Sequence, residues 1–188
     1  KNEDFYIEYI GSKEGIEKEL IEKINIPYNG ISSGKLRRYF DKKNFTDVFQ
    51  IIKGFSEARK ILKKINPDCV FSKGGFVTVP VVVAAKFLGI PVIIHESDIT
   101  CGLANRLSIP FSKYVCCTFP ETLENLPKNK AFLTGTPIRK ELFSGSVEKG
   151  SKLTGFPKKK PIILVMGGSL GSVIINNALR ECLDVLLK

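Results

Sequence analysis

His95, the single histidine of the chain, stands where an apolar segment gives way to polar residues. Residues 90–94 are apolar with one proline and favour a buried strand, and they are followed by His95, Glu96, Ser97 and Asp98. In open parallel α/β sheets, ligands bind at the carboxyl ends of the strands. His95, Glu96 and Asp98 are therefore candidate site residues. A structural histidine followed by turn-forming or helix-capping residues explains the same segment without a ligand.

Two glycine-rich turns follow other predicted strands. Gly74 and Gly75 come after residues 68–71, with Lys73 as an adjacent cation, and a second turn occupies residues 167–172. Glycines let the backbone approach a ligand closely, and the N-terminus of a following helix attracts phosphate. Ser169 would add a hydroxyl donor to the second turn, which has neither the Walker A nor the Rossmann spacing. Glycines that serve packing, beside a solvated lysine, are the alternative.

Arg139 follows a Gly-Thr-Pro turn at residues 135–137, after another predicted strand. The proline fixes the backbone, so the arginine leaves a stiff turn. A guanidinium group suits bidentate recognition of phosphate. A surface arginine at the start of a helix fits the same position.

Cations alternate with aromatic side chains between residues 35 and 45, and phenylalanines recur on one face of the helix predicted next. Core packing explains part of that face. The more specific interpretation is that this stretch forms a surface that lies on an anionic membrane. Nucleic-acid binding by stacked aromatics ranks last, because no DNA or RNA motif accompanies the stretch. The candidate membrane patch comprises Lys35, Arg37, Arg38, Phe45 and Phe49.

Strands and helices alternate along the chain, which is typical of a parallel, doubly wound α/β sheet. A shift to Ser, Gly, Lys and Pro predicts a linker over residues 146–160, between a domain at 1–145 and the start of a second α/β domain at 161–188. Strands are predicted at residues 5–10, 68–71, 91–95, 113–117, 131–134 and 161–166, a short extended segment at 26–28, and helices at 13–24, 45–65, 77–88, from 103, and at 173–187.

Composition narrows the class of protein. The 188 residues suit one domain plus part of another, and 43% hydrophobic content is ample for a core. No apolar run reaches the roughly 18–20 residues of a membrane span, and the start of the sequence lacks a signal peptide and looks internal to a longer protein.

The five cysteines have no CxxC spacing, which argues against disulfides and against a zinc site. Four of them are expected to be reduced core residues in a cytoplasmic protein. The net charge of +10 favours polyanionic partners, or is a generic lysine-rich surface.

These motifs, taken in order, resemble the MurG family of bacterial peripheral glycosyltransferases, which add N-acetylglucosamine to lipid I (undecaprenyl-pyrophosphoryl-muramyl-pentapeptide) and so make lipid II. The resemblance extends from about residue 5 to the C-terminus. Cys101 and Ser172 are small departures from it. The matching segments are residues 9–12, 31–38, 71–76, 89–92, 95–98, 102–105, 135–139 and 167–171.

The resemblance implies a GT-B fold, with two Rossmann-like domains and a cleft between them. It implies that Arg139 and Ser169 contact the donor, UDP-N-acetylglucosamine, as does Asp98 at a position that is often Asn. It places Gly74 and Gly75 in a loop associated with the acceptor pyrophosphate. His95 and Glu96 would shape the same cleft, in an acceptor-binding domain that touches the cytoplasmic face of the cell membrane.

The resemblance also places a strand and a glycine-rich loop ending in histidine upstream of residue 1, and that histidine is the usual candidate for the catalytic base. No catalytic residue is therefore assigned within this chain, which is expected to be inactive alone. The implied reaction inverts the anomeric carbon and needs no cofactor and no metal. The alternatives are another GT-B glycolipid synthase and a non-catalytic module that binds membrane or phosphate.

Overall fold

The computed structural model describes residues 5–34, 43–157, 161–168 and 171–187. Contacts between residues divide the chain into two compact units, Lys1–Pro137 and Ile138–Lys188. The predicted domain limits at residues 145 and 161 stay predictions. Each unit has its own architecture.

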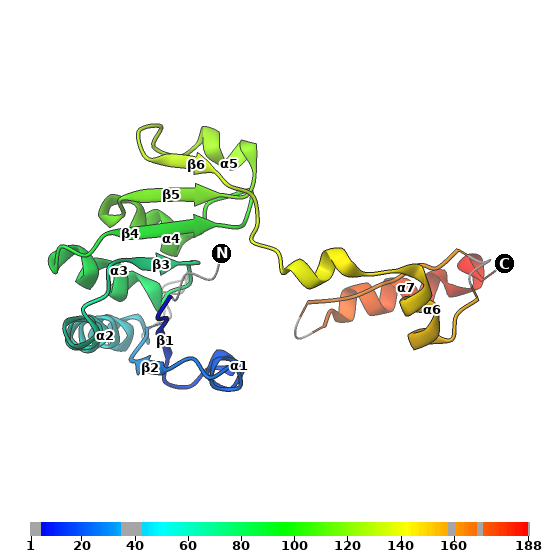
Figure 1. Ribbon diagram of the computed structural model, residues 1–188, viewed down its shortest axis with the longest axis horizontal. Coiled ribbons are helices and arrows are strands. Elements are labelled where there is room, and N and C mark those ends of the chain that lie inside the picture. Colours follow the sequence, from blue (N-terminus) through cyan, green and yellow to red (C-terminus); the bar gives the residue numbers. More distant parts are fainter. Residues whose placement is uncertain (1–4, 35–42, 158–160, 169–170, 188) are drawn as a thin grey trace. The chain divides into compact units, whose positions relative to one another are not determined.

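The larger sheet of the first unit has four parallel strands in the order β3-β4-β5-β6 (Figure 1). They are β3 (Val70–Ser72), β4 (Val92–Glu96), β5 (Tyr114–Cys117) and β6 (Ala131–Leu133). Strand β4 is almost wholly buried, as expected for a parallel strand covered on both faces. All four carboxyl ends meet at one edge of the sheet, so the loops that follow them are neighbours.

A second, two-stranded parallel sheet consists of β1 (Tyr9–Ser12) and β2 (Tyr28–Ile31), connected through α1 (Ile16–Glu22). The rings of Tyr9 and Tyr28 stack with centroids 5.5 Å apart, at the first pair of the register. Among the described residues, β1 pairs only with β2, and β3 pairs only with β4.

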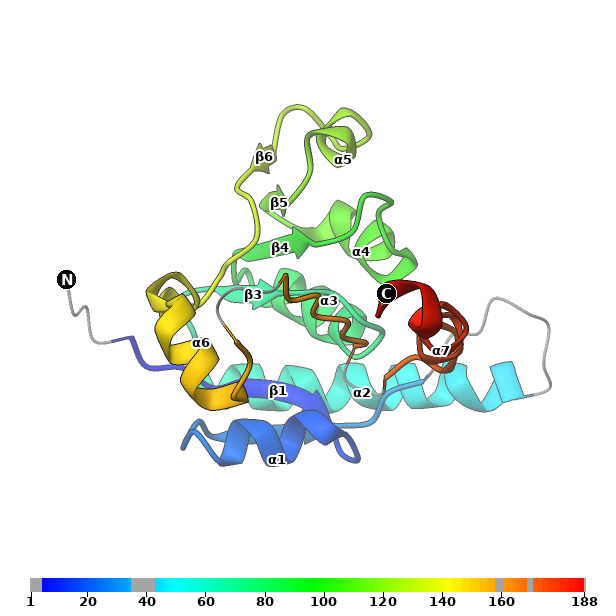
Figure 2. The same ribbon diagram turned by 90° about the vertical axis from the view of Figure 1, so that its right-hand side faces the viewer.

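The core of the first unit lies between the larger sheet and two helices, α2 (Lys43–Ile65) and α3 (Thr78–Phe87), which run beside each other (Figure 2). Helix α2 ends at Ile65, and the next residue, Asn66, adopts a positive φ of 50° immediately before Pro67. Helix α3 forms although it is rich in β-branched valines, because burial against α2 and the sheet outweighs its weak intrinsic propensity. The buried apolar side chains are Ile31, Ala58, Leu62, Val81, Val82, Ala84, Ala85, Val92, Ile94, Val115, Cys117 and Leu126.

The loops beyond β4 and β5 carry two short helices, α4 (Leu103–Ser108) and α5 (Pro120–Glu124), with a 3₁₀ turn, η1 (Ile109–Phe111), after α4. The predicted parallel α/β class is confirmed. The predicted strand at residues 5–10 starts too early, since β1 begins at Tyr9. Helix α5 was missed because five residues are too few for a helical periodicity to show.

The second unit contains a 3₁₀ segment, η2 (Lys140–Ser144), and two helices, α6 (Val147–Thr154) and α7 (Val173–Leu186). Ser146 and Ser172 cap α6 and α7, because each hydroxyl accepts a hydrogen bond from a backbone N–H of the first turn. The prediction of a strand at residues 161–166 is wrong for this chain, since the described part of the unit offers no partner strand. None of its described residues is buried.

Candidate functional site

The carboxyl edge of the larger sheet gathers most of the polar residues singled out in the sequence. Gly74 and Gly75 follow β3, and His95 and Glu96 end β4. Although both are polar, His95 is only 2% exposed and Glu96 only 5%. Buried polar groups are costly unless they are hydrogen-bonded, so their partners define what they do.

His95 connects the carboxyl ends of β3, β4 and β6. Its Nε2 lies 2.9 Å from the carbonyl oxygen of Gly135, after β6, and its Nδ1 lies 2.9 Å from Nζ of Lys73, after β3. A carbonyl oxygen only accepts a hydrogen bond, and a lysine ammonium only donates. The imidazole is therefore neutral with its proton on Nε2, which donates to Gly135 while Nδ1 accepts from Lys73.

Glu96 organises the loop after β4. Its carboxylate accepts hydrogen bonds of 2.9 Å from the backbone N–H groups of Asp98 and Gly102 and from Nδ2 of Asn105. Burial alone would raise the pKa of Glu96, but these donors outweigh it and hold the pKa below its ordinary value. Glu96 is thus an ionised structural anchor, and every donor it binds is on the loop or on α4.

The same loop is held from the other side by Thr122 of α5. The Thr122 hydroxyl lies 3.0 Å from the carbonyl oxygen of Asp98 and 2.9 Å from that of Ile99. Anchored through its backbone, the loop leaves the Asp98 side chain exposed. Sequence reasoning missed Thr122, because a threonine on a short helix carries no signal that it reaches another loop.

The Gly74–Gly75 turn requires glycine for two physical reasons. Both residues have φ near +91°, a region that side chains rarely allow. In addition, a Cβ on Gly74 would stand 3.1 Å from the amide of Asn105, which is 96% buried against the turn. Thr78 donates its hydroxyl to the Gly75 carbonyl at 2.8 Å and so ties the turn to the start of α3.

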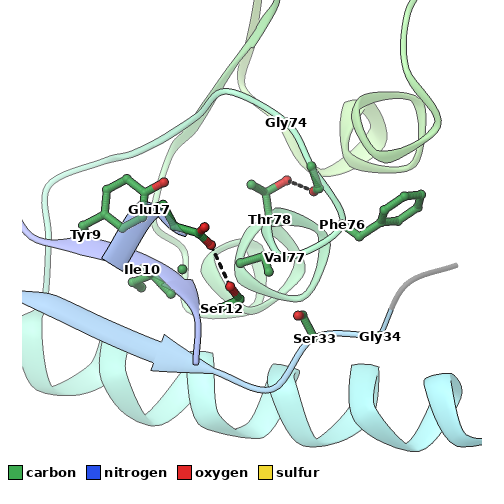
Figure 3. A pocket seen from close by; sticks show the side chains of 12 residues that line it. Tyr9, Ile10, Ser12, Glu17, Ser33, Gly34, Gly74, Phe76, Val77 and Thr78 are labelled. Carbon is green, nitrogen blue, oxygen red and sulfur yellow. Dashed lines mark hydrogen bonds between the residues drawn. The ribbon is translucent and has the colours of Figure 1, made fainter. Parts of the chain in front are cut away.

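A pocket of about 290 Å³ opens beside this turn (Figure 3). Its lining comes from the carboxyl ends of β1 and β2 on one side and from the start of α3 on the other. Within it, Ser12 donates its hydroxyl to Glu17 at 2.7 Å, and this bond lowers the pKa of the Glu17 carboxyl. The lining residues are Tyr9, Ile10, Gly11, Ser12, Glu17, Ser33, Gly34, Gly74, Gly75, Phe76, Val77 and Thr78.

The wall at Ser33 and Gly34 is fixed by Glu57 of α2. Glu57 accepts a 2.6 Å hydrogen bond from the backbone N–H of Ser32 and forms a 2.7 Å ion pair with Lys13. Gly54 lets α2 come this close, because a Cβ there would collide with the Ser32 carbonyl oxygen. Of the residues that line this pocket, only Gly74 and Gly75 were predicted as site residues from the sequence.

The predicted donor-binding residues are divided between the two units. Asp98 belongs to the first unit and Arg139 to the second, and both side chains are exposed. Ser169 lies outside the described residues. This donor set stays a prediction.

The predicted membrane patch is described only in part. Lys35, Arg37 and Arg38 lie outside the described residues, as does the side chain of Phe45. Phe49 projects from α2 and is 73% exposed. No helix in the described part of the chain is long and apolar enough to cross a membrane.

Cysteine placement corrects one expectation. All five cysteines are free, but only Cys117 is buried, whereas Cys69 and Cys182 are exposed. Apolar neighbours in sequence mislead here, because Cys69 lies just before β3 and Cys182 lies on α7, which has no buried residue among those described. The described residues contain no cluster of three or more His, Cys, Asp or Glu placed to hold a metal ion.

Comparison with known proteins identifies the family. The N-terminal domain of glycosyltransferase family 28 matches residues 1–117, more than half of the sequence. The chain belongs to glycosyltransferase family 28. The matched residues lie entirely within the first unit.

Curated relatives of this family-28 chain carry one enzyme name, UDP-N-acetylglucosamine–N-acetylmuramyl-(pentapeptide) pyrophosphoryl-undecaprenol N-acetylglucosamine transferase. The protein of Lachnoclostridium phytofermentans is 62% identical over 188 residues, all of this chain and 53% of that protein. The protein of Clostridium tetani is 61% identical over 184 residues, 98% of this chain and 51% of that protein. The resemblance drawn from the motifs is confirmed, and the chain spans about half the length of these relatives.

Solved structures agree with the family-28 assignment. The crystal structure of Acinetobacter baumannii MurG matches 94% of this chain and 44% of its own length, with a TM-score of 0.63 and 30% identity. A UDP-GlcNAc 2-epimerase from Methanocaldococcus jannaschii matches 72% of the chain and 39% of its own length, with a TM-score of 0.50 at 22% identity. The second likeness concerns the fold alone.

Proposed function

We propose that the complete protein transfers N-acetylglucosamine from UDP-N-acetylglucosamine to the muramyl residue of lipid I, making lipid II for peptidoglycan synthesis. The identity of about 60% along the whole chain to transferases of that name carries the proposal. In this assignment residues 1–137 belong to the acceptor-binding half. In that half, hydrogen bonds of His95, Glu96 and Thr122 hold the loops at the carboxyl edge of the larger sheet.

The proposed reaction is a direct displacement. A base removes the proton of the acceptor C4 hydroxyl, the hydroxyl oxygen forms a bond to the anomeric carbon, and the bond to UDP breaks on the opposite face. The anomeric configuration is therefore inverted. The base is the histidine expected upstream of residue 1. Arg139, Ser169 and the N-terminus of α7 stabilise negative charge on the departing diphosphate, and Asp98 contacts the donor.

The acceptor is proposed to lie with its pyrophosphate at the Gly74–Gly75 turn. The positive φ values of that turn and its position ahead of α3 suit an anion. The undecaprenyl chain stays in the membrane, so the enzyme works at the cytoplasmic face as a peripheral protein. Exposed Phe49, together with Lys35, Arg37 and Arg38, is proposed to contact anionic lipid.

The test is transfer of labelled N-acetylglucosamine to a lipid I analogue by the protein from the complete coding sequence. We expect transfer with inversion at the anomeric carbon, a large loss on Arg139→Ala, and no transfer by residues 1–188 alone. Preference for a diacylglycerol acceptor over lipid I would contradict the proposal and favour a glycolipid synthase. An absence of any sugar transfer would favour the binding-module alternative.

A further inference from the structure

The chain that leaves β6 turns back across the carboxyl edge of the larger sheet before the second unit begins. Thr134 extends the ladder, because its N–H donates to the Cys117 carbonyl of β5 at 3.0 Å. The next residue, Gly135, has a φ of +70°, in the region that favours glycine, and its carbonyl meets His95 of β4. The connecting segment, residues 134–137, thus reaches past β5 to β4.

A buried side chain provides the hydrogen bond that holds this segment. His95 is 2% exposed, and its Nε2 donates to the Gly135 carbonyl oxygen at 2.9 Å. Lys73 donates to Nδ1 at 2.9 Å, so the imidazole proton stays on the nitrogen that faces Gly135. A hydrogen bond from a buried donor is costly to lose, because the donor finds no water in its place. His95 is therefore a firm attachment for the connecting segment.

A second attachment follows one residue later. The hydroxyl oxygens of Thr118, directly after β5, and Thr136 lie 3.1 Å apart. Thr118 is itself joined to β4, because its N–H donates to the Glu96 carbonyl at 3.0 Å. The hydroxyl pair is exposed, so water can replace it and it contributes less than the buried imidazole. Together the two attachments hold the connecting segment as far as Thr136.

Little freedom remains between Thr136 and Arg139. Pro137 has a fixed φ and restricts the residue before it, and Arg139 has an extended backbone with φ −63° and ψ 134°. Three residues span at most about 11 Å, so the Cα of Arg139 stays within that distance of the Cα of Thr136. The second unit begins between them, at Ile138. The attachments in the first unit therefore restrict where the Arg139 guanidinium can lie.

We propose that His95 is a positioning residue for the nucleoside diphosphate: by holding the Gly135 carbonyl, it orders in advance the chain that carries Arg139. The inference rests on the proposed function, in which Arg139 binds the diphosphate of the donor. A ligand that must first order a flexible segment binds more weakly than one that meets an ordered segment. His95 thus strengthens donor binding through the backbone, without contacting the donor.

Two substitutions of His95 separate its two hydrogen bonds. The amide nitrogen of glutamine lies near the place of Nε2 and can donate to Gly135, whereas the shorter asparagine can accept from Lys73 but does not reach Gly135. Binding of UDP to the full-length protein, measured by calorimetry, should weaken about tenfold in His95→Asn and less than about threefold in His95→Gln. Equal affinities of the two variants, or a larger loss in His95→Gln, would overturn the proposal.

Ser108→Ala is the control for a general loosening of the first unit. Ser108 is buried on α4, and its hydroxyl donates to the Ala104 carbonyl of the same helix at 2.8 Å. The substitution removes a buried hydrogen bond away from the connecting segment, so UDP affinity should stay within about twofold of the unaltered protein. A loss as large as that of His95→Asn would show that any buried hydrogen bond of the unit has this effect, and the proposal would fail.

A double-mutant cycle tests whether His95 acts through Arg139. In the Arg139→Ala protein no guanidinium remains to be positioned, so adding His95→Asn should change UDP affinity by less than about twofold. The same tenfold loss in both backgrounds would show that the two residues act independently, which contradicts the proposal.

Hydrogen exchange gives a readout that needs no substrate. The Thr134 amide, which donates to Cys117, should exchange about fivefold faster in His95→Asn than in His95→Gln, because the attachment at Gly135 protects the end of the ladder. Equal exchange rates would contradict the attachment.

These measurements separate the inference from the proposed function. UDP binding that depends on His95 and Arg139, in a protein that transfers no sugar to lipid I, would leave the inference standing and defeat the function. Transfer to lipid I by a protein whose UDP affinity is indifferent to His95→Asn would do the reverse.

Discussion

The two units of this chain differ in how their apolar residues are used. In the first, residues from α2, α3 and the larger sheet bury one another, and Ile94 is completely inaccessible. In the second unit, most residues of α7 are also apolar, yet none of its described side chains is buried. An amphipathic helix gains stability mainly from the surface its apolar face covers, so helical sequence alone does not make a folded domain.

The largest expected difference between the two units is in their rates of amide hydrogen exchange. Amides of β4 and β5 are expected to exchange at least about 1,000-fold more slowly than those of α7, because core strands open only in global unfolding whereas short, unsupported helices are marginal in water. Mass spectrometry of this chain gives both rates in one experiment. Equal protection of α7 and β4 would show that the second unit is stabilised by itself.

A matched pair of isoleucine substitutions tests the same difference energetically. Ile94→Ala should lower the free energy of unfolding by about 2–5 kcal/mol, because it opens a cavity in the core. Ile174 is 82% exposed on α7, and Ile174→Ala should change the unfolding free energy by less than about 0.5 kcal/mol. Urea denaturation followed by circular dichroism measures both. A cost above 1 kcal/mol for Ile174→Ala would mean that its face is covered.

Glu96→Gln probes the buried polar network of the first unit. The amide would set an N–H₂ group against backbone donors, at a cost of about 2 kcal/mol. The folded-state pKa of Glu96 is lowered, so its carboxylate contributes stability above the ordinary value of 4.5, and this contribution is lost as pH falls through the folded pKa. The difference in unfolding free energy between the parent and Glu96→Gln should therefore shrink below about pH 4.5, as urea titrations at several pH values would measure. A difference independent of pH would contradict the assignment of an ionised Glu96.

Sequence patterns predicted what depends on local chemistry, and missed what depends on partners. The apolar run before His95 and the glycines at 74 and 75 were sufficient to locate a strand end and a tight turn. The residues 161–166 have the same apolar character but form no strand, because ladder partners are not encoded in the segment itself. The contacts of Thr122 and Glu57 likewise connect residues more than twenty positions apart, which no local spacing reveals.

The smallest expected difference is in the reactivity of individual thiols, which can be compared because cysteines occur in both units. Burial, followed by the negative charge of Glu96, raises the pKa of Cys101 to about 12. Nucleophilic attack requires the thiolate, so Cys101 should be alkylated by iodoacetamide at pH 8 at least about tenfold more slowly than exposed Cys69 of the same unit and exposed Cys182 of the second. Glu96→Gln should accelerate Cys101 alone, because it removes the adjacent negative charge, and peptide mass spectrometry resolves each site. If Cys101 reacted as fast as Cys182, the loop after β4 would be opening as readily as the unsupported helix of the second unit, and the ordering assigned to Glu96 would fail with it.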